Sequence, residues 1–117
     1  MKYKFSKKEA VRFRKSGVEM WVYSDKNNCD KGNLIYQEVD GGHNEEFLNS
    51  RSAFIYYIVE GRGIFVIEDE EIPVEAGDTV IVPPGKRFYY LGKMKQVLVT
   101  APAWEEGTDK IIKKIII

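Results

Sequence analysis

Cysteine and histidine are nearly missing from this chain, and each shortage excludes a kind of chemistry. The 117 residues contain one cysteine, Cys29, and one histidine, His43. A lone cysteine cannot form an intrachain disulfide, and it favours a reducing compartment. A lone histidine means that one chain cannot build a three-histidine metal site, or a site of two histidines and a carboxylate. We therefore expect no bound metal and no other cofactor.

An excess of charge of either sign is also missing. The chain has 18 Lys and Arg against 18 Asp and Glu, so its formal net charge is zero. This balance excludes the strong basic field with which many proteins hold nucleic acid or an anionic membrane surface. No apolar run approaches the roughly 18 residues of a membrane span, and the first ten residues lack the apolar core of a signal peptide. We expect a cytoplasmic protein that binds neither nucleic acid nor membrane.

The remaining composition is that of one folded domain, which we place at residues 1–117. The mass is 13.5 kDa, with 44% hydrophobic and 31% charged residues, which is enough apolar material for a single core. Short segments rich in strand-forming residues recur about every ten residues, with turn residues between them. This pattern predicts an all-β sandwich or barrel. The predicted strands are 18–23, 34–39, 54–59, 64–67, 71–74, 79–82, 88–91 and 96–100.

The two ends of the chain carry separate signals. Ser6 is followed three residues later by Glu9, the pattern of a capping box. It predicts a short helix over about 6–15, which is too short to stand alone and must dock on the main body. The apolar tail 111–117 contains five isoleucines, and such a segment is an aggregation hazard when exposed. We expect the tail to pair as a strand, with this chain or with a partner.

The turn residues between positions 42 and 92 carry a resemblance to a known family. Gly42 and Gly61, and then Gly77, Pro83-Pro84-Gly85 and Gly92, have the spacing of the two sequence motifs of the cupins. The chain therefore resembles a small cupin, and the resemblance implies a double-stranded β-helix, or jelly-roll barrel. We expect the barrel core to span about 18–104.

The same resemblance places the family's usual metal ligands on residues that do not bind metals. The first motif, which runs Gly, five residues, His-x-His, three or four residues, Glu, six residues and Gly, puts its ligands at Leu48, Ser50 and Phe54 when it starts at Gly42. The histidine of the second motif falls on Phe88. None of these side chains is an ordinary ligand of a transition metal. The resemblance therefore implies a cupin that works without metal.

Alternation along the strands predicts which side chains face the barrel interior. If Phe54 and Phe88 point inward, Tyr56 and Tyr90 do so as well, and we expect Tyr36 and Glu38 to face the same space. An aromatic cavity with a few hydroxyl groups suits a sugar or a flat metabolite. The predicted ligand pocket contains Tyr36, Glu38, Leu48, Ser50, Phe54, Tyr56, Phe88, Tyr90 and Trp104.

Three functions remain open on these residues. The first is a cupin that binds a small molecule without catalysis. The second, which the resemblance to metal-free cupins implies, is an isomerase or epimerase acting on a sugar or nucleotide sugar, with His43 as the base and a pocket tyrosine as the acid. The third is a structural domain whose aromatic rings fill the barrel. The candidate catalytic residues are His43, Tyr36, Glu38, Tyr56 and Tyr90.

A homodimer is the expected assembly. Tyr57 and Val59 alternate with the inward-facing residues of their strand, so they face outward and need a cover. A second subunit, joined by a two-fold axis, is the commonest solution. The isoleucine tail supplies further apolar surface for such a contact.

Overall fold

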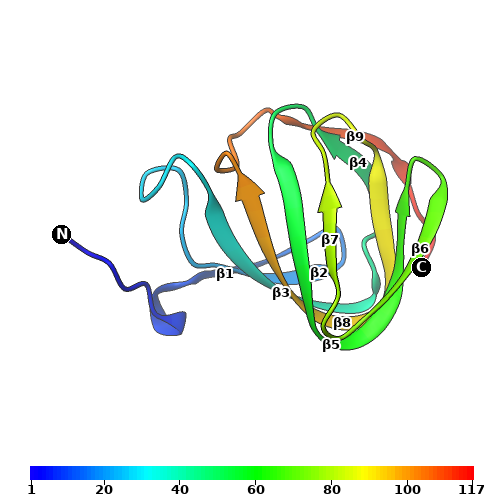
Figure 1. The fold of residues 1–117 in the computed structure, drawn as a ribbon, viewed down its shortest axis with the longest axis horizontal. Helices are drawn as coiled ribbons and strands as arrows, with labels where there is room; N and C mark the ends of the chain where they lie inside the picture. The colour runs from blue at the N-terminus through cyan, green and yellow to red at the C-terminus, as the bar shows by residue number, and fades with distance from the viewer.

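The computed structural model describes residues 1–117 and consists almost entirely of antiparallel strands that curl into a barrel (Figure 1). One short 3-10 turn, η1, precedes nine strands. The elements are η1 Lys7–Glu9, β1 Val11–Lys15, β2 Val18–Val22, β3 Asn33–Gly42, β4 Glu45–Asn49, β5 Ala53–Ile67, β6 Glu70–Glu75, β7 Thr79–Val82, β8 Phe88–Ala101 and β9 Asp109–Lys114. The predicted all-β fold is confirmed, and every predicted strand segment lies within a strand apart from Tyr23.

The strands form one strongly curled sheet. Its main path runs β1-β2-β3-β8-β4-β9, and β5 pairs with β6, β7 and β8. β5 and β8 are the longest strands and stay paired from Ala53 opposite Ala101 to Ile67 opposite Phe88. Because both strands bend, they contribute to opposite walls of the barrel, as Figure 1 shows.

The predicted strands 54–59 and 64–67 are one strand, because the segment between them continues β5 through the bend and is not a turn. Gly63 lies opposite Gly92 of β8, and Gly92 has a φ of 131°. A Cβ atom on Gly92 would lie 2.6 Å from the carbonyl oxygen of Arg62. Only glycine permits so close an approach of two backbones, so these glycines bend a continuous strand pair and do not end it.

The predicted helix over 6–15 is also wrong. The capping box does form, with the Ser6 hydroxyl donating to the Glu9 carboxylate at 2.9 Å, but it caps only the single turn η1. Val11–Lys15 instead pairs with β2. Ser16 and Gly17 both have positive φ, as a tight hairpin turn requires. Pairing with β2 satisfies the backbone of this segment, whereas a helix of ten residues is marginal by itself.

The polar segment 43–52 and the isoleucine tail together form a strand pair that closes one side of the barrel. β4 lies in a segment for which no strand was predicted, and it pairs with β9 of the same chain, which includes the first part of the tail. The register shifts at a bulge between Glu46 and Phe47. The tail is therefore a strand of its own barrel.

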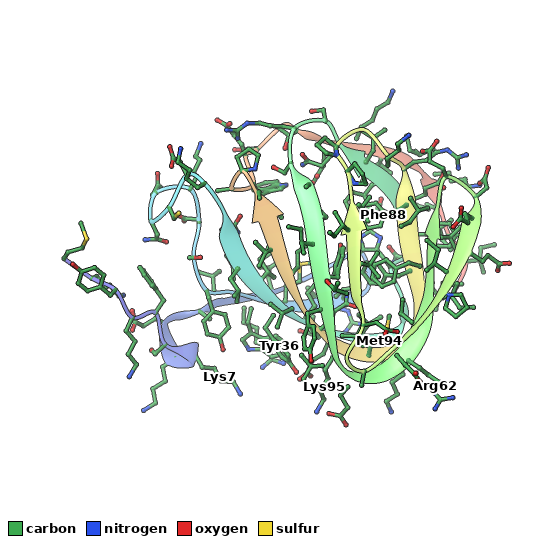
Figure 2. The ribbon with its side chains drawn as sticks, in the orientation of Figure 1. Lys7, Tyr36, Arg62, Phe88, Met94 and Lys95 are labelled. Atoms are coloured by element: carbon green, nitrogen blue, oxygen red, sulfur yellow. The ribbon has the colours of Figure 1, made fainter.

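Inward and outward faces differ sharply along β5. Phe54, Tyr56 and Ile58 are buried, whereas Tyr57 and Val59 are about half exposed. Figure 2 shows Phe88 inside the barrel, with Lys95 on the outer side. No helix in the structure has the length and apolar character to cross a membrane.

Candidate functional site

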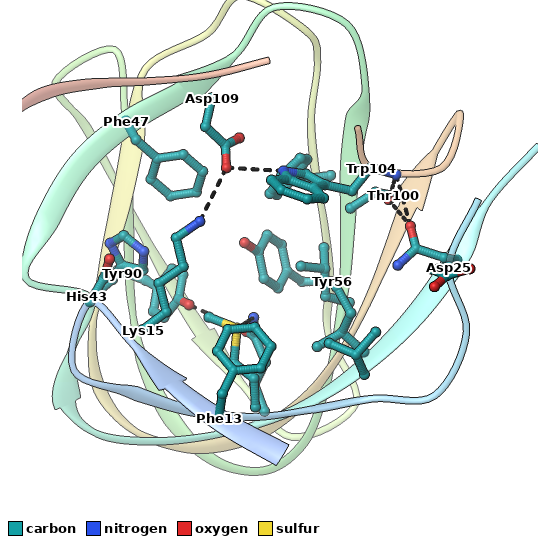
Figure 3. Close-up of a pocket in the computed structure, with 18 of the residues that line it drawn as sticks. Phe13, Lys15, Asp25, His43, Phe47, Tyr56, Tyr90, Thr100, Trp104 and Asp109 are labelled. Atoms are coloured by element: carbon teal, nitrogen blue, oxygen red, sulfur yellow. Dashed lines mark hydrogen bonds and ion pairs between the residues drawn. The ribbon is translucent and has the colours of Figure 1, made fainter. Parts of the chain in front are cut away.

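The barrel is not packed solid. A cavity of about 420 Å³ lies between the walls (Figure 3). Its lining comes from β1, β2, β3, β4, β5, β8 and β9, together with the loop before β3 and the segments around His43 and Trp104. The interpretation of the chain as a structural domain with a filled barrel is therefore wrong. Among the predicted pocket and catalytic residues, the cavity is lined by His43, Phe54, Tyr56, Tyr90 and Trp104.

Tyr36 and Glu38 do not face the cavity, so their assignment to the pocket is wrong. The buried residues of this part of β3 are Ile35 and Gln37, and both line the cavity. The Tyr36 ring instead packs against Trp21 on the outer face. Its hydroxyl donates to Glu38 at 2.9 Å. Burial, followed by the neighbouring Glu38 carboxylate, raises the pKa of Tyr36 to about 12.

Leu48 and Ser50 are also misplaced, by one residue. After the bulge on β4 the buried side chains are Phe47 and Asn49, while Leu48 is half-buried and Ser50 exposed. The cause is the doublet Gly41-Gly42, which allows two registers. Counted from Gly41 with four spacer residues before Phe54, the same motif falls on Phe47 and Asn49. The inward alternation follows this second register.

Phenylalanine rings occupy three of the four positions where the family's metal ligands would lie, and Asn49 occupies the fourth. Phe47, Phe54 and Phe88, here called the phenylalanine cluster, are each at most 6% exposed. The ring centroids of Phe47 and Phe88 are 4.6 Å apart, and Phe54 lies 5.8 and 5.9 Å from them. Phe88 backs the cavity wall without being part of it. The chain nowhere brings three or more His, Cys, Asp or Glu side chains together as metal ligands.

His43 is held in one orientation at the edge of the phenylalanine cluster. Gly42 lets the chain pass close to β8, since a Cβ atom there would lie 2.7 Å from the Tyr90 carbonyl oxygen. The His43 backbone N–H donates to that oxygen at 2.8 Å. The ring stacks on Phe47 at 4.7 Å. Its Nδ1 lies 2.5 Å from the carbonyl oxygen of Glu45.

These contacts determine the chemical state of the imidazole. Because a carbonyl oxygen only accepts, Nδ1 carries the proton and Nε2 keeps a lone pair. Nε2 has no hydrogen-bond partner in the protein, and it is not one of the fully buried atoms that lack a partner. It therefore opens on the cavity that His43 lines. Burial lowers the pKa of His43, and the hydrogen bond to Glu45 only partly opposes this effect. The ring is therefore neutral at neutral pH and suited to accept a proton.

Two tyrosines share the cavity with His43 and keep their protons. Tyr56 and Tyr90 are both 1% exposed, and their ring centroids lie 5.6 Å apart. Burial raises the pKa of both phenols, well above the ordinary value for Tyr56. The Tyr90 hydroxyl donates to the side-chain oxygen of Gln37 at 3.3 Å, which also accepts from Gln96 at 2.8 Å. Phenols with raised pKa values serve as hydrogen-bond donors over the whole neutral range.

Asp109 of β9 organises charged and aromatic groups beside the cavity. Its carboxylate accepts from the indole N–H of Trp104 at 3.0 Å and from Asn49 at 2.8 Å. The Lys15 ammonium lies 3.4 Å from the same carboxylate and 5.5 Å from the centre of the Trp104 ring. Trp104 is thus fixed as a wall of the cavity. Lys15 is the one cationic side chain in the lining.

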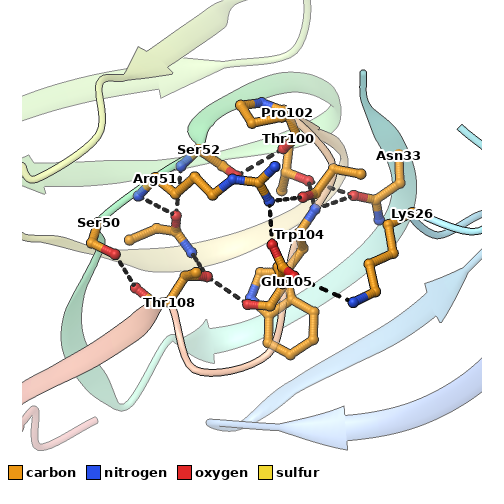
Figure 4. Close-up of polar contacts among 12 residues, drawn as sticks. Lys26, Asn33, Ser50, Arg51, Ser52, Thr100, Pro102, Trp104, Glu105 and Thr108 are labelled. Atoms are coloured by element: carbon orange, nitrogen blue, oxygen red, sulfur yellow. Dashed lines mark hydrogen bonds and ion pairs between the residues drawn. The ribbon is translucent and has the colours of Figure 1, made fainter. Parts of the chain in front are cut away.

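The opposite end of the cavity is built around Asn33. Figure 3 shows His43 and Lys15 on one side of the space and Asp25 and Thr100 on the other. The side-chain oxygen of Asn33 accepts from the Trp104 backbone N–H at 2.9 Å and from the Thr100 hydroxyl at 2.5 Å. Figure 4 shows these bonds, with Glu105 joined to Arg51 and Lys26 nearby.

Several residues of the lining were missed by the sequence reasoning. They are Lys15, Asn33, Gln37, Phe47 and Asp109. Phe47 was within reach, because the motif counted from Gly41 identifies it. The other four carry no local signal, since a polar residue on a half-buried strand has the same appearance whether it faces water or a cavity.

Comparison with known proteins assigns the chain to a family. A family model described as a cupin domain matches residues 32–98, which is more than half of the chain. The chain therefore belongs to the cupins. An RmlC-like cupin from Shewanella frigidimarina shares the fold, with a TM-score of 0.74 at 17% identity over 90% of this chain and 96% of that one.

A closer structural relative is Pac13 from Streptomyces, described as a nucleoside dehydratase. It superposes with a TM-score of 0.95 at 36% identity, over 99% of this chain and 95% of Pac13. Three Pac13 variants are solved with uridine, one with a histidine replaced by glutamine and two with a tyrosine replaced by phenylalanine.

A curated relative matches only in part. An uncharacterized protein of Methanocaldococcus jannaschii is 50% identical over 33 residues, which is 28% of this chain. The match spans about a quarter of that protein's length, 26%.

Proposed function

We propose that this cupin binds a nucleoside in its barrel and removes water from the sugar without a metal ion. The observation that carries the proposal is the convergence of His43, Tyr56 and Tyr90 on one cavity. The Pac13 variants replace one histidine and two tyrosines. The residue number of each in Pac13 is one lower than that of His43, Tyr56 or Tyr90 here. With an alignment covering 99% of this chain, a constant offset of one supports their equivalence.

The first step of a dehydration needs a base, and His43 has the required state. Its Nε2 is unprotonated and opens on the cavity, so it can take a proton from a sugar carbon. The proton moves from the sugar C–H group to Nε2. The electron pair of the C–H bond forms the new C=C bond while the neighbouring C–O bond breaks. A carbonyl group beside that carbon is needed to acidify the C–H bond, so the expected substrate is a nucleoside with an oxidised sugar.

The leaving hydroxyl needs a proton, and His43 is again the best donor. Burial lowers the pKa of His43, so the imidazolium formed in the first step gives up its proton readily. Tyr56 and Tyr90 hold theirs firmly because burial raises their pKa values. We infer that the histidine returns the proton, water departs, and the two phenols orient the substrate as hydrogen-bond donors.

Uridine binding tests the first half of the proposal. We expect uridine to raise the melting temperature of the wild-type chain, since a ligand that binds only the folded state stabilises it. The His43→Gln variant keeps a polar side chain of similar size, so it should still bind uridine but lose turnover of the oxidised nucleoside. Loss of water is read directly as a mass decrease of the product. Absence of uridine binding by the wild type would overturn the proposal.

Epimerisation or isomerisation of a sugar, the alternative from the sequence, begins with the same proton abstraction. The two reactions separate in heavy water. A dehydratase yields an unsaturated product, whereas an epimerase returns a saturated sugar that carries deuterium at the carbon from which the proton was taken. Deuterated sugar without loss of water would favour the epimerase. Binding of uridine with neither product would favour a binding protein without catalysis.

Metal independence belongs to the same proposal and rests on the donor set. The phenylalanine cluster stands at the family's ligand positions, and the chain has a single histidine. Elemental analysis of protein purified without chelator or metal-affinity tag should therefore show well under one equivalent of iron, manganese, nickel or zinc. A stoichiometric ion that disappears in the His43→Gln variant would contradict this expectation.

A further inference from the structure

The end of the cavity farthest from His43 holds a polar group that the proposed chemistry does not use. Asn33 is 5% exposed and lines the cavity, together with Asp25 and Thr100. These residues come from β3, from the loop before it and from the end of β8. A nucleoside has two parts, so a sugar placed beside His43 leaves this end for the base.

The orientation of the Asn33 amide is determined by its neighbours. A backbone N–H can only donate, and that of Trp104 lies 2.9 Å from the side-chain oxygen. The Thr100 hydroxyl donates to the same oxygen. The amide NH2 group therefore points away from both. This NH2 group has no hydrogen-bond partner in the protein, and its nitrogen is not one of the fully buried atoms that lack a partner. It is therefore a donor open to the cavity.

An acceptor stands at the same end. One oxygen of the Asp25 carboxylate accepts from the Asn27 backbone N–H at 2.9 Å, and the other has no partner in the protein. Asp25 borders the cavity and is itself exposed. An N–H2 donor beside a carboxylate acceptor is complementary to a carbonyl oxygen beside an N–H, the edge of an oxo-pyrimidine ring.

We infer that Asn33 is a specificity-determining residue that donates a hydrogen bond to a carbonyl oxygen of the base, so that the cavity selects oxo-pyrimidine nucleosides such as uridine. This inference rests on the proposed function, because it assumes that a nucleoside occupies the cavity with its sugar near His43. The carbonyl is at ring position 2, which uracil and cytosine share, or at position 4, where cytosine has an amino group. The shared chemistry is a carbonyl acceptor.

The Asn33→Asp variant removes the donor and keeps the structural role. A carboxylate oxygen still accepts from Trp104 and Thr100, but no N–H2 remains to meet the carbonyl. At pH 8 we expect the Kd for uridine, measured by calorimetry, to rise at least about tenfold. Asn28→Asp is the matched control. It adds the same charge in the neighbouring loop and keeps the acceptor that Asn28 offers to the Asp25 backbone N–H, so its Kd for uridine should not change.

The outcomes separate this inference from the proposed function. If the wild type binds uridine and Asn33→Asp binds it equally well, the base subsite is wrong and the nucleoside cavity stands. If the wild type does not bind uridine, the proposed function fails and the inference fails with it. Cytidine assigns the carbonyl: weak binding to the wild type that improves in Asn33→Asp indicates position 4, and a parallel loss for both nucleosides indicates position 2.

A second measurement does not depend on the variant folding. Adenosine has no carbonyl oxygen on its base, so the wild-type chain should bind it at least about tenfold more weakly than uridine. Equal affinities of the wild type for adenosine and uridine would overturn the inference.

Discussion

The phenylalanine cluster and the cavity beside it lie in the same barrel and differ in what they do. In the cluster, three rings from β4, β5 and β8 contact one another and leave no polar group. In the cavity, His43, Tyr90 and Asn33 each have one hydrogen-bonding group engaged by the protein. The phenylalanine rings therefore fill only the space around the family's ligand positions, and the rest of the barrel interior remains a cavity. The barrel stays open, and the residues around the cavity are held in place by hydrogen bonds to one another and to the backbone.

The largest expected effect comes from breaking the phenylalanine cluster. Phe88 is 1% exposed, so Phe88→Ala leaves a hole among rigid rings and should cost about 3–5 kcal/mol of unfolding free energy. Phe13→Ala is the control at the open cavity, because Phe13 is 40% exposed. Its cost should be less than about 1.5 kcal/mol, since a large part of its surface is already exposed in the folded chain. Urea unfolding measures both, and equal costs would contradict the contrast between a filled and an open region.

The next effect concerns β9, which carries Asp109 at the cavity. Deleting residues 111–117 removes most of the strand paired with β4, and we expect a loss of about 1–3 kcal/mol from the partly buried isoleucines. Deleting only 116–117 is the matched control, because these side chains are 97% and 58% exposed. That control should change the melting temperature little. A full deletion that leaves stability unchanged would show that the β4–β9 pairing does not support the barrel.

The homodimer remains a prediction, and the outer face of β5 is where we expect it. Tyr57 and Val59 are 51% and 47% exposed, while β9 pairs with β4 within the chain, which leaves this face as the main surface to cover. Tyr57→Ser should weaken a dimer about tenfold, equivalent to about 1.4 kcal/mol, without changing uridine affinity. Light scattering that finds a wild-type species of 13.5 kDa at micromolar concentration would contradict the dimer.

The smallest expected effect is a pH dependence of the unfolding free energy, which arises from His43 at the cavity and has no counterpart in the phenylalanine cluster. Burial lowers the pKa of His43 from its ordinary value of 6.5, so the unfolded chain binds the proton more readily than the folded one. Stability is therefore complete above about pH 6.5 and falls as the pH drops from there through the folded pKa. Because the chain has no other histidine, the His43→Gln variant should lose most of this slope between about pH 7 and pH 5. An unchanged slope in chemical unfolding would contradict a buried, neutral His43.

Much of the fold was predictable from local residues. Strand-forming segments separated by glycine and proline indicated the barrel, and the motif spacing identified a cupin. The N-terminal helix failed because a capping box reports only one turn, and the pairing of Val11–Lys15 with β2 decided the rest. The long strands β5 and β8 were divided in the prediction because their glycines resemble turns when the opposite strand is unknown.

The inward-facing residues of the site were predictable on strands where the motif spacing fixed one inward position, because side chains alternate from there. Phe54 and Phe88 anchored the pattern for Tyr56 and Tyr90, and all four are buried. On β3 no such anchor existed, and the prediction placed Tyr36 and Glu38 inside. The buried face of this strand is the alternate one, which carries Ile35, Gln37 and Val39. There Gln37 is buried because Gln96 and Tyr90 satisfy its oxygen, and Tyr36 lies outside against Trp21.

The sequence by itself determined the fold class, the loss of the family's metal ligands and the short supply of titratable groups, because each depends on residue identity or spacing along the chain. Only the tertiary structure decided that the barrel is open and that Lys15, Asn33 and Asp109 surround the same space as His43. The physical reason is that the antiparallel pairing brings together residues up to 94 positions apart, as in the Lys15–Asp109 pair. Whether rings fill a barrel depends on how they pack in three dimensions, which no local pattern records.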